Sequence, residues 1–200
     1  MRTRVKSPDT GDYRKLTRVM KYLQATINVP LSLEGGNMRI IKWWVDASYA
    51  VHPDMKSHTG ACMSLGKGSI YSSSTRQKLN TKSSTEAMLV GVSDAMSQIV
   101  WTRYFMEAQG YEISENVLEQ DNMSAMLLEN NGRASSSKRT RHINIRYFFV
   151  TDRIKNGEVS VSHCPTGEMV ADFLTKPLQG TTFRKFRNLI MNVKVTLPIE

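Results

Sequence analysis

The chain has 200 residues, of which 40% are hydrophobic and 22% charged, and its formal net charge is +9. This length and composition suit one globular domain with short appendages. Two cysteines are too few for a cysteine-based zinc cluster, and no apolar run approaches the roughly 20 residues that cross a bilayer.

The charge is unevenly distributed along the chain. Residues 1–42 carry a net charge of +6, residues 181–200 carry +3, and residues 43–180 are neutral. Basic ends around a neutral middle favour a polyanionic partner such as nucleic acid, although a merely soluble surface has the same pattern. Because no signal peptide opens the chain, we expect a reducing, cytoplasmic location without secretion or membrane attachment.

The first predicted element is an amphipathic helix at about residues 12–25. Its apolar residues recur at the spacing of one helix face, namely Leu16, Val19, Met20 and Leu23. Asp12 is the expected N-cap of this helix.

A turn at residues 35–37 and three strands follow, at about 38–50, 58–66 and 69–74. Glycines at 66 and 68 predict that the second and third strands form a hairpin. These three strands therefore form an antiparallel meander.

The second half of the chain alternates helices with short strands. The periodicity first predicts a helix at 84–108, a strand at 117–120 and a helix at 122–129. After a loop at 130–140, it predicts a helix at 143–155, a strand at 158–164, a helix from near 168 and a helix at 181–192. The whole pattern predicts an α/β fold, with a five-stranded mixed sheet flanked by helices.

Four acidic residues lie at strand ends or helix starts of this pattern: Asp46, Glu86, Asp121 and Asp172. Asp46 ends an apolar strand, where a buried lone carboxylate is costly unless a cation neutralises it. Strand ends and helix starts meet at one edge of an open α/β sheet, so the four acids can converge. Oxygen ligands suit hard cations such as Mg²⁺ or Mn²⁺.

Each acid also has a purely structural interpretation. Asp46 can lie in water at an open strand end. Glu86 can belong to a capping box with Ser83, and Asp121 can be a helix N-cap. Asp172 can be an ordinary exposed helix acid. Taken one by one, these residues leave both interpretations open.

Five sequence motifs occur in a fixed order: VDASYA, TKSSTEAM, EQDNMSAMLLE, KRTRHINIRYFFV and MVADFLTKPL. They resemble the ribonuclease H domain of copia-type LTR-retrotransposon Pol polyproteins. Residues 13–26 resemble the helix that joins reverse transcriptase to that domain, and no Tyr-x-Asp-Asp polymerase motif occurs. The resemblance implies a remnant of the reverse transcriptase connection at 1–40, a ribonuclease H-like domain at 41–180, and an amphipathic helix and tail at 181–200.

The resemblance also implies an activity, namely metal-dependent hydrolysis of the RNA strand of RNA–DNA hybrids during reverse transcription. It assigns metal binding and catalysis to Asp46, Glu86, Asp121 and Asp172, with two Mg²⁺ or Mn²⁺ ions and no other cofactor. The implied partners are the hybrid and the reverse transcriptase portion of the same polyprotein, inside a cytoplasmic virus-like particle. The alternative is a truncated or decayed fragment that binds nucleic acid without efficient catalysis.

Nucleic-acid contacts are expected beside the acids. Small polar groups suit the 2′-hydroxyls of RNA, which indicates Ser83, Ser84 and Asn122, with helix capping as the equal alternative. Basic residues on either side can bind phosphates or can simply be solvated: Arg76, Lys78, Lys82, Lys138, Arg139 and Arg141.

Histidines are where the sequence departs from the related enzymes. Cellular and retroviral relatives carry a histidine on the loop before the last aspartate, but residues 165–171 contain none. His163 ends the preceding strand, and His142 belongs to one of the motifs. The sequence assigns no catalytic role to either, and it does not define the oligomeric state.

Overall fold

The computed structural model of the chain describes residues 5–131 and 141–193, with side chains in the second range from residue 145 onward. The chain divides into two compact units, Met1–Leu31 and Ser32–Glu200. Among the described residues, no helix combines the length and apolar composition that crossing a membrane requires.

The first unit contains one helix, α1 (Thr10–Ala25). Its N-cap is Asp9 and not the expected Asp12, which lies at the third helical position. Asp9 Oδ1 accepts the Asp12 N–H at 2.9 Å and Asp12 Oδ2 accepts the Asp9 N–H at 3.1 Å, so the two form a capping box. No residue of α1 is buried, and its apolar face is exposed at Leu16, Met20 and Leu23.

The second unit is built on a five-stranded mixed sheet, as the sequence predicted. Its strand order is β5-β3-β2-β6-β7. The strands are β2 (Ile40–Ser48), β3 (His58–Ser64), β5 (Tyr71–Arg76), β6 (Glu115–Gln120) and β7 (Ser160–His163). β2, β3 and β5 are antiparallel neighbours, whereas β6 is parallel to β2 and β7 is parallel to β6.

A separate two-stranded ribbon was not predicted. β1 (Glu34–Gly35) pairs with β4 (Gly66–Lys67), which lies between the two strands of the predicted hairpin. A Cβ at Gly66 would lie 2.3 Å from the Glu34 carbonyl oxygen, so only glycine permits this pairing.

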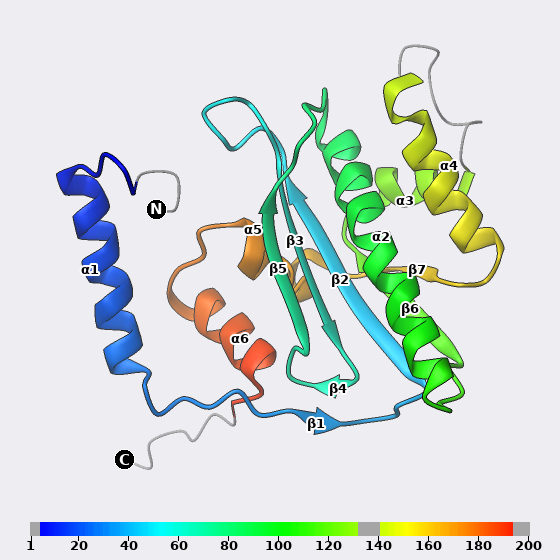
Figure 1. Cartoon of the computed structure of the whole chain (residues 1–200), viewed down its shortest axis with the longest axis horizontal. Coiled ribbons are helices and arrows are strands. Elements are labelled where there is room, and N and C mark those ends of the chain that lie inside the picture. The colour runs from blue at the N-terminus through cyan, green and yellow to red at the C-terminus, as the bar shows by residue number, and fades with distance from the viewer. Residues whose placement is uncertain (1–4, 132–140, 194–200) are drawn as a thin grey trace. The chain divides into compact units, whose positions relative to one another are not determined.

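Helices cover both faces of the sheet (Figure 1). One face is covered by α2 (Ser84–Ala108), α3 (Met123–Asn131) and α4 (Arg141–Lys155). The other face carries α5 (Asp172–Thr175) and α6 (Gly180–Met191), which follow the 3-10 turn η3 (Thr166–Glu168).

Alternation along β2 sends neighbouring side chains to opposite faces. Trp43 and Val45 are fully buried in the main core with α2. Trp44, between them, packs against the smaller cluster of Cys164, Met169 and Ala171 on the other face. By the same alternation, Asp46 lies on the face of Trp44.

The helix predicted from near residue 168 is wrong in extent. The segment forms the turn η3 and then α5, which has only four residues. Pro177 explains the stop, because proline disfavours helical backbone at the preceding residue. Lys176 is accordingly extended, with φ −117° and ψ 144°.

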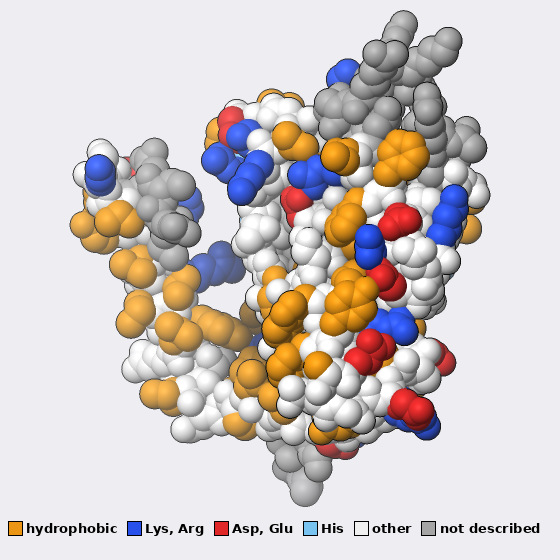
Figure 2. All heavy atoms as spheres, turned by 45° about the vertical axis from the view of Figure 1, so that its right-hand side comes forward, with side chains coloured by type: hydrophobic (Ala, Val, Ile, Leu, Met, Phe, Trp, Pro, Cys, Tyr) orange, Lys and Arg blue, Asp and Glu red, His pale blue; other side chains and the backbone are white. Residues whose placement is uncertain are grey.

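The outer side of α2 is largely exposed and carries aromatic residues. Trp101 and Phe105 stack there with ring centroids 5.1 Å apart, and both are about half exposed. Figure 2 shows hydrophobic side chains on this side of the molecule, interspersed with charged side chains of both signs.

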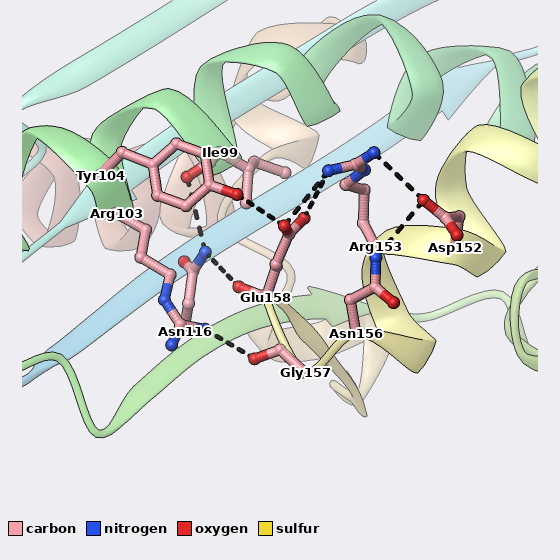
Figure 3. A network of polar contacts seen from close by, with 9 residues as sticks. All are labelled: Ile99, Arg103, Tyr104, Asn116, Asp152, Arg153, Asn156, Gly157 and Glu158. Carbon is pink, nitrogen blue, oxygen red and sulfur yellow. Dashed lines mark hydrogen bonds and ion pairs between the residues drawn. The ribbon is translucent and has the colours of Figure 1, made fainter.

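A polar network joins α2, α4 and the amino-terminal ends of β6 and β7 (Figure 3). The Glu158 carboxylate accepts hydrogen bonds from Tyr104 Oη at 2.5 Å and from Arg153 Nη1 at 2.9 Å. Buried Asn116 donates to the carbonyl oxygens of Ile99 and Glu158. The network lies at the amino-terminal ends of β6 and β7, whereas the predicted acids lie at the opposite edge of the sheet.

Candidate active site

Two of the four predicted acids come together at the carboxyl end of β2. Asp46 is 3% exposed and Asp172, the first residue of α5, is 6% exposed. Lys176 Nζ lies 2.6 Å from Asp172 Oδ1 and 3.6 Å from Asp46 Oδ2. Thr175 Oγ1 donates a hydrogen bond to Asp46 Oδ2. Two buried carboxylates therefore share one ammonium group.

The charges of Asp46, Asp172 and Lys176 affect the pKa values of Asp172 and Lys176. Burial raises the pKa of Asp172 to about 6, and the negative charge of Asp46 adds to the rise, while the Lys176 hydrogen bond opposes it. Burial lowers the pKa of Lys176, but its hydrogen bond to Asp172 and the charges of Asp46, Asp172 and Asp121 outweigh burial, so the pKa is raised. Both shifts follow from the burial of two carboxylates that share one ammonium group.

Asp121 lies at the same edge of the sheet. It follows β6, which pairs with β2 in parallel, and its charge is one of those that raise the pKa of Lys176. The Asp121 carboxylate accepts a hydrogen bond from Thr166 Oγ1 at 3.2 Å. Asp121 thus contributes charge to the site, while its side chain is held by the turn η3.

Glu86 lies at the third position of α2 and is 9% exposed. Ser83, the N-cap, accepts the Glu86 N–H at 3.1 Å. The Glu86 carboxylate accepts the Lys82 N–H at 2.7 Å, one residue before the position of a standard capping box. In this structure Glu86 therefore stabilises the start of α2.

Whether a divalent metal fits this site depends on the carboxylate oxygens of the four predicted acids. Among the residues that the structure describes, no three His, Cys, Asp or Glu side chains are gathered closely enough to hold a metal ion. Asp46 and Asp172 already hold one cation, the Lys176 ammonium, through oxygen atoms. This pair therefore suits a hard divalent cation, whereas Glu86 and Asp121 are bonded elsewhere.

Several of the residues predicted to contact nucleic acid have contacts within the protein or are exposed. Ser83 caps α2, and Asn122 Oδ1 accepts the Ala125 N–H at 3.0 Å at the start of α3. Ser84 and Lys78 are exposed, and Arg76 Nη1 lies 2.9 Å from Asp54 Oδ2. Lys138, Arg139 and the side chains of Arg141 and His142 lie outside the described residues. RNA or phosphate contact by any of these residues stays a prediction.

Sequence reasoning assigned no role to Thr175 or Lys176, although both belong to the motif MVADFLTKPL. The spacing of Asp172 and Lys176 was a usable signal, because an acid and a base four residues apart on a helix are neighbours. It also missed Gly60, which faces Asp46 across the β2–β3 pair. A glycine within a strand often marks a close approach by another segment.

A histidine pair lies near α5. His52 Nε2 and His58 Nδ1 are 3.0 Å apart, and His58 Nε2 lies 2.8 Å from Ser74 Oγ. Ser74 donates to the Leu174 carbonyl oxygen at 2.7 Å. His163, at the end of β7, is exposed.

The strand order and the helices on both faces define the ribonuclease H fold. A solved structure of LC11-RNase H1, isolated from compost, superposes with a TM-score of 0.50, covering 68% of this chain and 93% of that chain at 12% identity. At this identity the likeness establishes the fold, and it confirms the fold class expected from the sequence.

No family model matches the chain. The retrovirus-related Pol polyprotein from transposon RE2 of Arabidopsis thaliana is 32% identical over 190 residues, or 94% of this chain and 13% of the relative. The corresponding polyprotein from transposon TNT 1-94 of Nicotiana tabacum is 28% identical over 187 residues, or 93% of this chain and 14% of the relative.

The chain is thus a homologue of the retrovirus-related Pol polyproteins of copia-type transposons, and the resemblance inferred from its motifs is confirmed. It spans about one eighth of the length of these relatives.

Proposed function

We propose that this chain is a retrotransposon ribonuclease H, which hydrolyses the RNA strand of RNA–DNA hybrids during reverse transcription. One observation carries the proposal: Asp46 and Asp172, both buried, share a cation at the carboxyl edge of a ribonuclease H-fold sheet. The homology to Pol polyproteins supports it, because reverse transcription produces such hybrids.

In this proposal, Asp46 and Asp172 hold Mg²⁺, or Mn²⁺ in its place. Glu86 and Asp121 complete the site once their carboxylates release Lys82 and Thr166. When bound, two such ions lower the pKa of an attacking water and stabilise the departing oxygen of the scissile phosphate. Asp46, on the central strand β2, would be a ligand of this site.

The substrate is bound by groups beside the acids. Ser83, Ser84 and Asn122 are proposed to contact the 2′-hydroxyls that distinguish RNA from DNA. Arg76 and Lys78, both exposed before α2, are proposed to contact phosphates together with Lys138, Arg139 and Arg141.

The domain organisation follows the family resemblance. Residues 1–40 are proposed to be a remnant of the reverse transcriptase connection, 41–180 the catalytic domain, and 181–200 an amphipathic helix and tail. The unburied apolar face of α1 supports the first assignment, because such a face suits contact with the reverse transcriptase portion of the polyprotein.

The test is Mg²⁺-dependent cleavage of an end-labelled RNA–DNA hybrid by the whole chain, with duplex DNA and duplex RNA as controls. Cleavage of the RNA strand of the hybrid alone is expected, and Asp46→Asn should abolish nearly all of it. Asp94→Asn, which alters an exposed acid paired with Arg146, is the matched control and should cleave normally. Full hybrid cleavage by Asp46→Asn would overturn the proposal.

A second candidate function is hybrid binding without efficient catalysis. It is favoured by one observation, namely that Glu86 and Asp121 are hydrogen-bonded to Lys82 and Thr166 and not turned to the Asp46–Asp172 pair. The same experiment separates the two functions. Tight hybrid binding with no cleavage at saturating Mg²⁺ or Mn²⁺ would favour the second.

A further inference from the structure

Lys176 provides the positive charge between the two buried aspartates. Its Nζ is 2.6 Å from one Asp172 oxygen and 3.6 Å from one Asp46 oxygen. No other Lys or Arg among the described residues forms an ion pair with either aspartate. The ammonium therefore occupies the space in which an ion bound by this pair would lie.

Local structure explains how Lys176 comes to this position. It is the C-cap of α5, and its backbone N–H donates to the Asp172 carbonyl oxygen at 2.9 Å, which keeps the two residues close together. Pro177 holds the Lys176 backbone extended and ends the helix there. The Lys176 side chain is 38% exposed, so its flexible stem can carry the ammonium into water without any change in the backbone.

An ammonium and a divalent cation exclude each other from this position. Like charges a few ångströms apart repel strongly where water is scarce, and the two aspartates are almost fully buried. Conversely, the two carboxylates repel each other if no cation lies between them. Asp46 and Asp172 therefore require a cation between them, which is either the Lys176 ammonium or a divalent metal ion, but not both at once.

We propose that Lys176 is a resident cation of the site: it neutralises Asp46 and Asp172 in the metal-free protein, and a divalent metal must displace it to bind. This inference rests on the proposed function, because it takes the same pair to be the metal ligands. Lys176 thereby sets the metal concentration that the enzyme requires and stabilises the fold when metal is absent.

Direct metal binding tests the inference. Mn²⁺ binding to the whole chain is measured by electron paramagnetic resonance for wild type, Lys176→Met and Lys176→Arg. Lys176→Met keeps an aliphatic side chain without the charge, and it should bind Mn²⁺ about tenfold more tightly. Lys176→Arg should bind as wild type does. Lys155→Met, at the exposed end of α4, is the control and should also match wild type.

Thermal unfolding gives a second readout. In a metal chelator, Lys176→Met should unfold at a lower temperature than wild type, and added Mn²⁺ should raise its unfolding temperature by more than it raises that of wild type. Equal Mn²⁺ affinity in wild type and Lys176→Met would overturn the inference.

A measurement on the wild-type protein tests whether Mn²⁺ displaces Lys176, even if Lys176→Met does not fold. Lysine acylation is followed by peptide mass spectrometry with and without Mn²⁺. Displacement predicts that Lys176 reacts severalfold faster when Mn²⁺ is bound, because its amine then loses its carboxylate partners, while Lys155 is unaffected. An unchanged rate at Lys176 would contradict displacement.

The inference and the proposed function fail in different ways. If wild type cleaves the hybrid with Mg²⁺ but removing the Lys176 charge leaves metal affinity unchanged, only the role of Lys176 is wrong. If wild type neither binds Mn²⁺ nor cleaves, both are wrong.

Discussion

Gly60 lies directly opposite Asp46 across the antiparallel β2–β3 pair. A Cβ at Gly60 would lie 2.8 Å from Leu174 Cβ and 2.9 Å from the Ala171 carbonyl oxygen. The missing side chain therefore lets α5 pack directly on the sheet beside Asp46. This close approach is what brings Asp172, Thr175 and Lys176 to the carboxyl end of β2.

Gly60→Ala should accordingly impair the site. The added methyl group must displace α5, and overpacking of this kind costs about 1–3 kcal/mol of stability. We expect a lower unfolding temperature and a large loss of hybrid cleavage. Gly167→Ala, where a Cβ meets nothing within 4 Å, is the control and should behave as wild type. Normal cleavage by Gly60→Ala would show that the packing of α5 is not needed.

The hydroxyl of Thr175 should stabilise the metal-free protein through Asp46. Thr175→Val keeps the shape of the side chain but removes the hydrogen bond to a buried carboxylate, which costs about 1–3 kcal/mol. Thr175→Ser restores the hydroxyl and should recover most of the stability. Urea unfolding in a metal chelator measures both. Destabilisation by serine but not by valine would mean that the methyl group, and not the hydroxyl, matters.

Periodicity explains which parts of this arrangement the sequence predicted. The apolar run Trp43-Trp44-Val45 identified a buried strand, and the motifs identified Asp46 and Asp172 as candidates. The long helix was predicted with the same bounds, 84–108, because its apolar pattern spans many turns. These features depend on residues close together in sequence.

Contacts between distant segments were not predicted. The approach of α5 to Gly60 joins residues more than 100 positions apart, as does the contact of Lys176 with Asp46. The β1–β4 ribbon likewise depends on the meeting of Gly66 with Glu34. Hydrophobic period and capping preferences describe single elements, so they do not specify which elements meet.

Glu158 should make the fold sensitive to acid. Burial raises its pKa, but hydrogen bonds from Tyr104 and Arg153 outweigh burial and lower the pKa below the ordinary 4.5. Its contribution to stability is therefore complete above pH 4.5 and is lost as the pH falls through the lowered pKa. Glu158→Gln should weaken this loss in urea unfolding at low pH.

Glu158→Gln also tests whether the network in Figure 3 is separate from the site. Because this network lies at the opposite end of β6 and β7, hybrid cleavage by the variant should be normal at neutral pH. Strongly reduced cleavage by a folded Glu158→Gln protein would contradict this separation.

Glu129 should give the opposite pH dependence. This residue of α3 is fully buried, and one of its carboxyl oxygens accepts a hydrogen bond from Gln120 Nε2 at 3.0 Å. Burial raises its pKa from 4.5 to about 8, although the Gln120 hydrogen bond opposes the rise. Between these values the folded state keeps a proton that the unfolded state has released. Stability is therefore greatest below pH 4.5 and declines as the pH rises to about 8.

Glu129→Gln removes the titrating group while keeping the shape of the side chain. Wild type should lose on the order of a few kcal/mol of unfolding free energy across this pH range, and Glu129→Gln should lose much less. Urea unfolding at a series of pH values measures both slopes. Glu115→Gln, at the exposed start of β6, is the control and should keep the wild-type slope. If wild type and Glu129→Gln decline equally, the buried carboxyl group is not the source of the pH dependence.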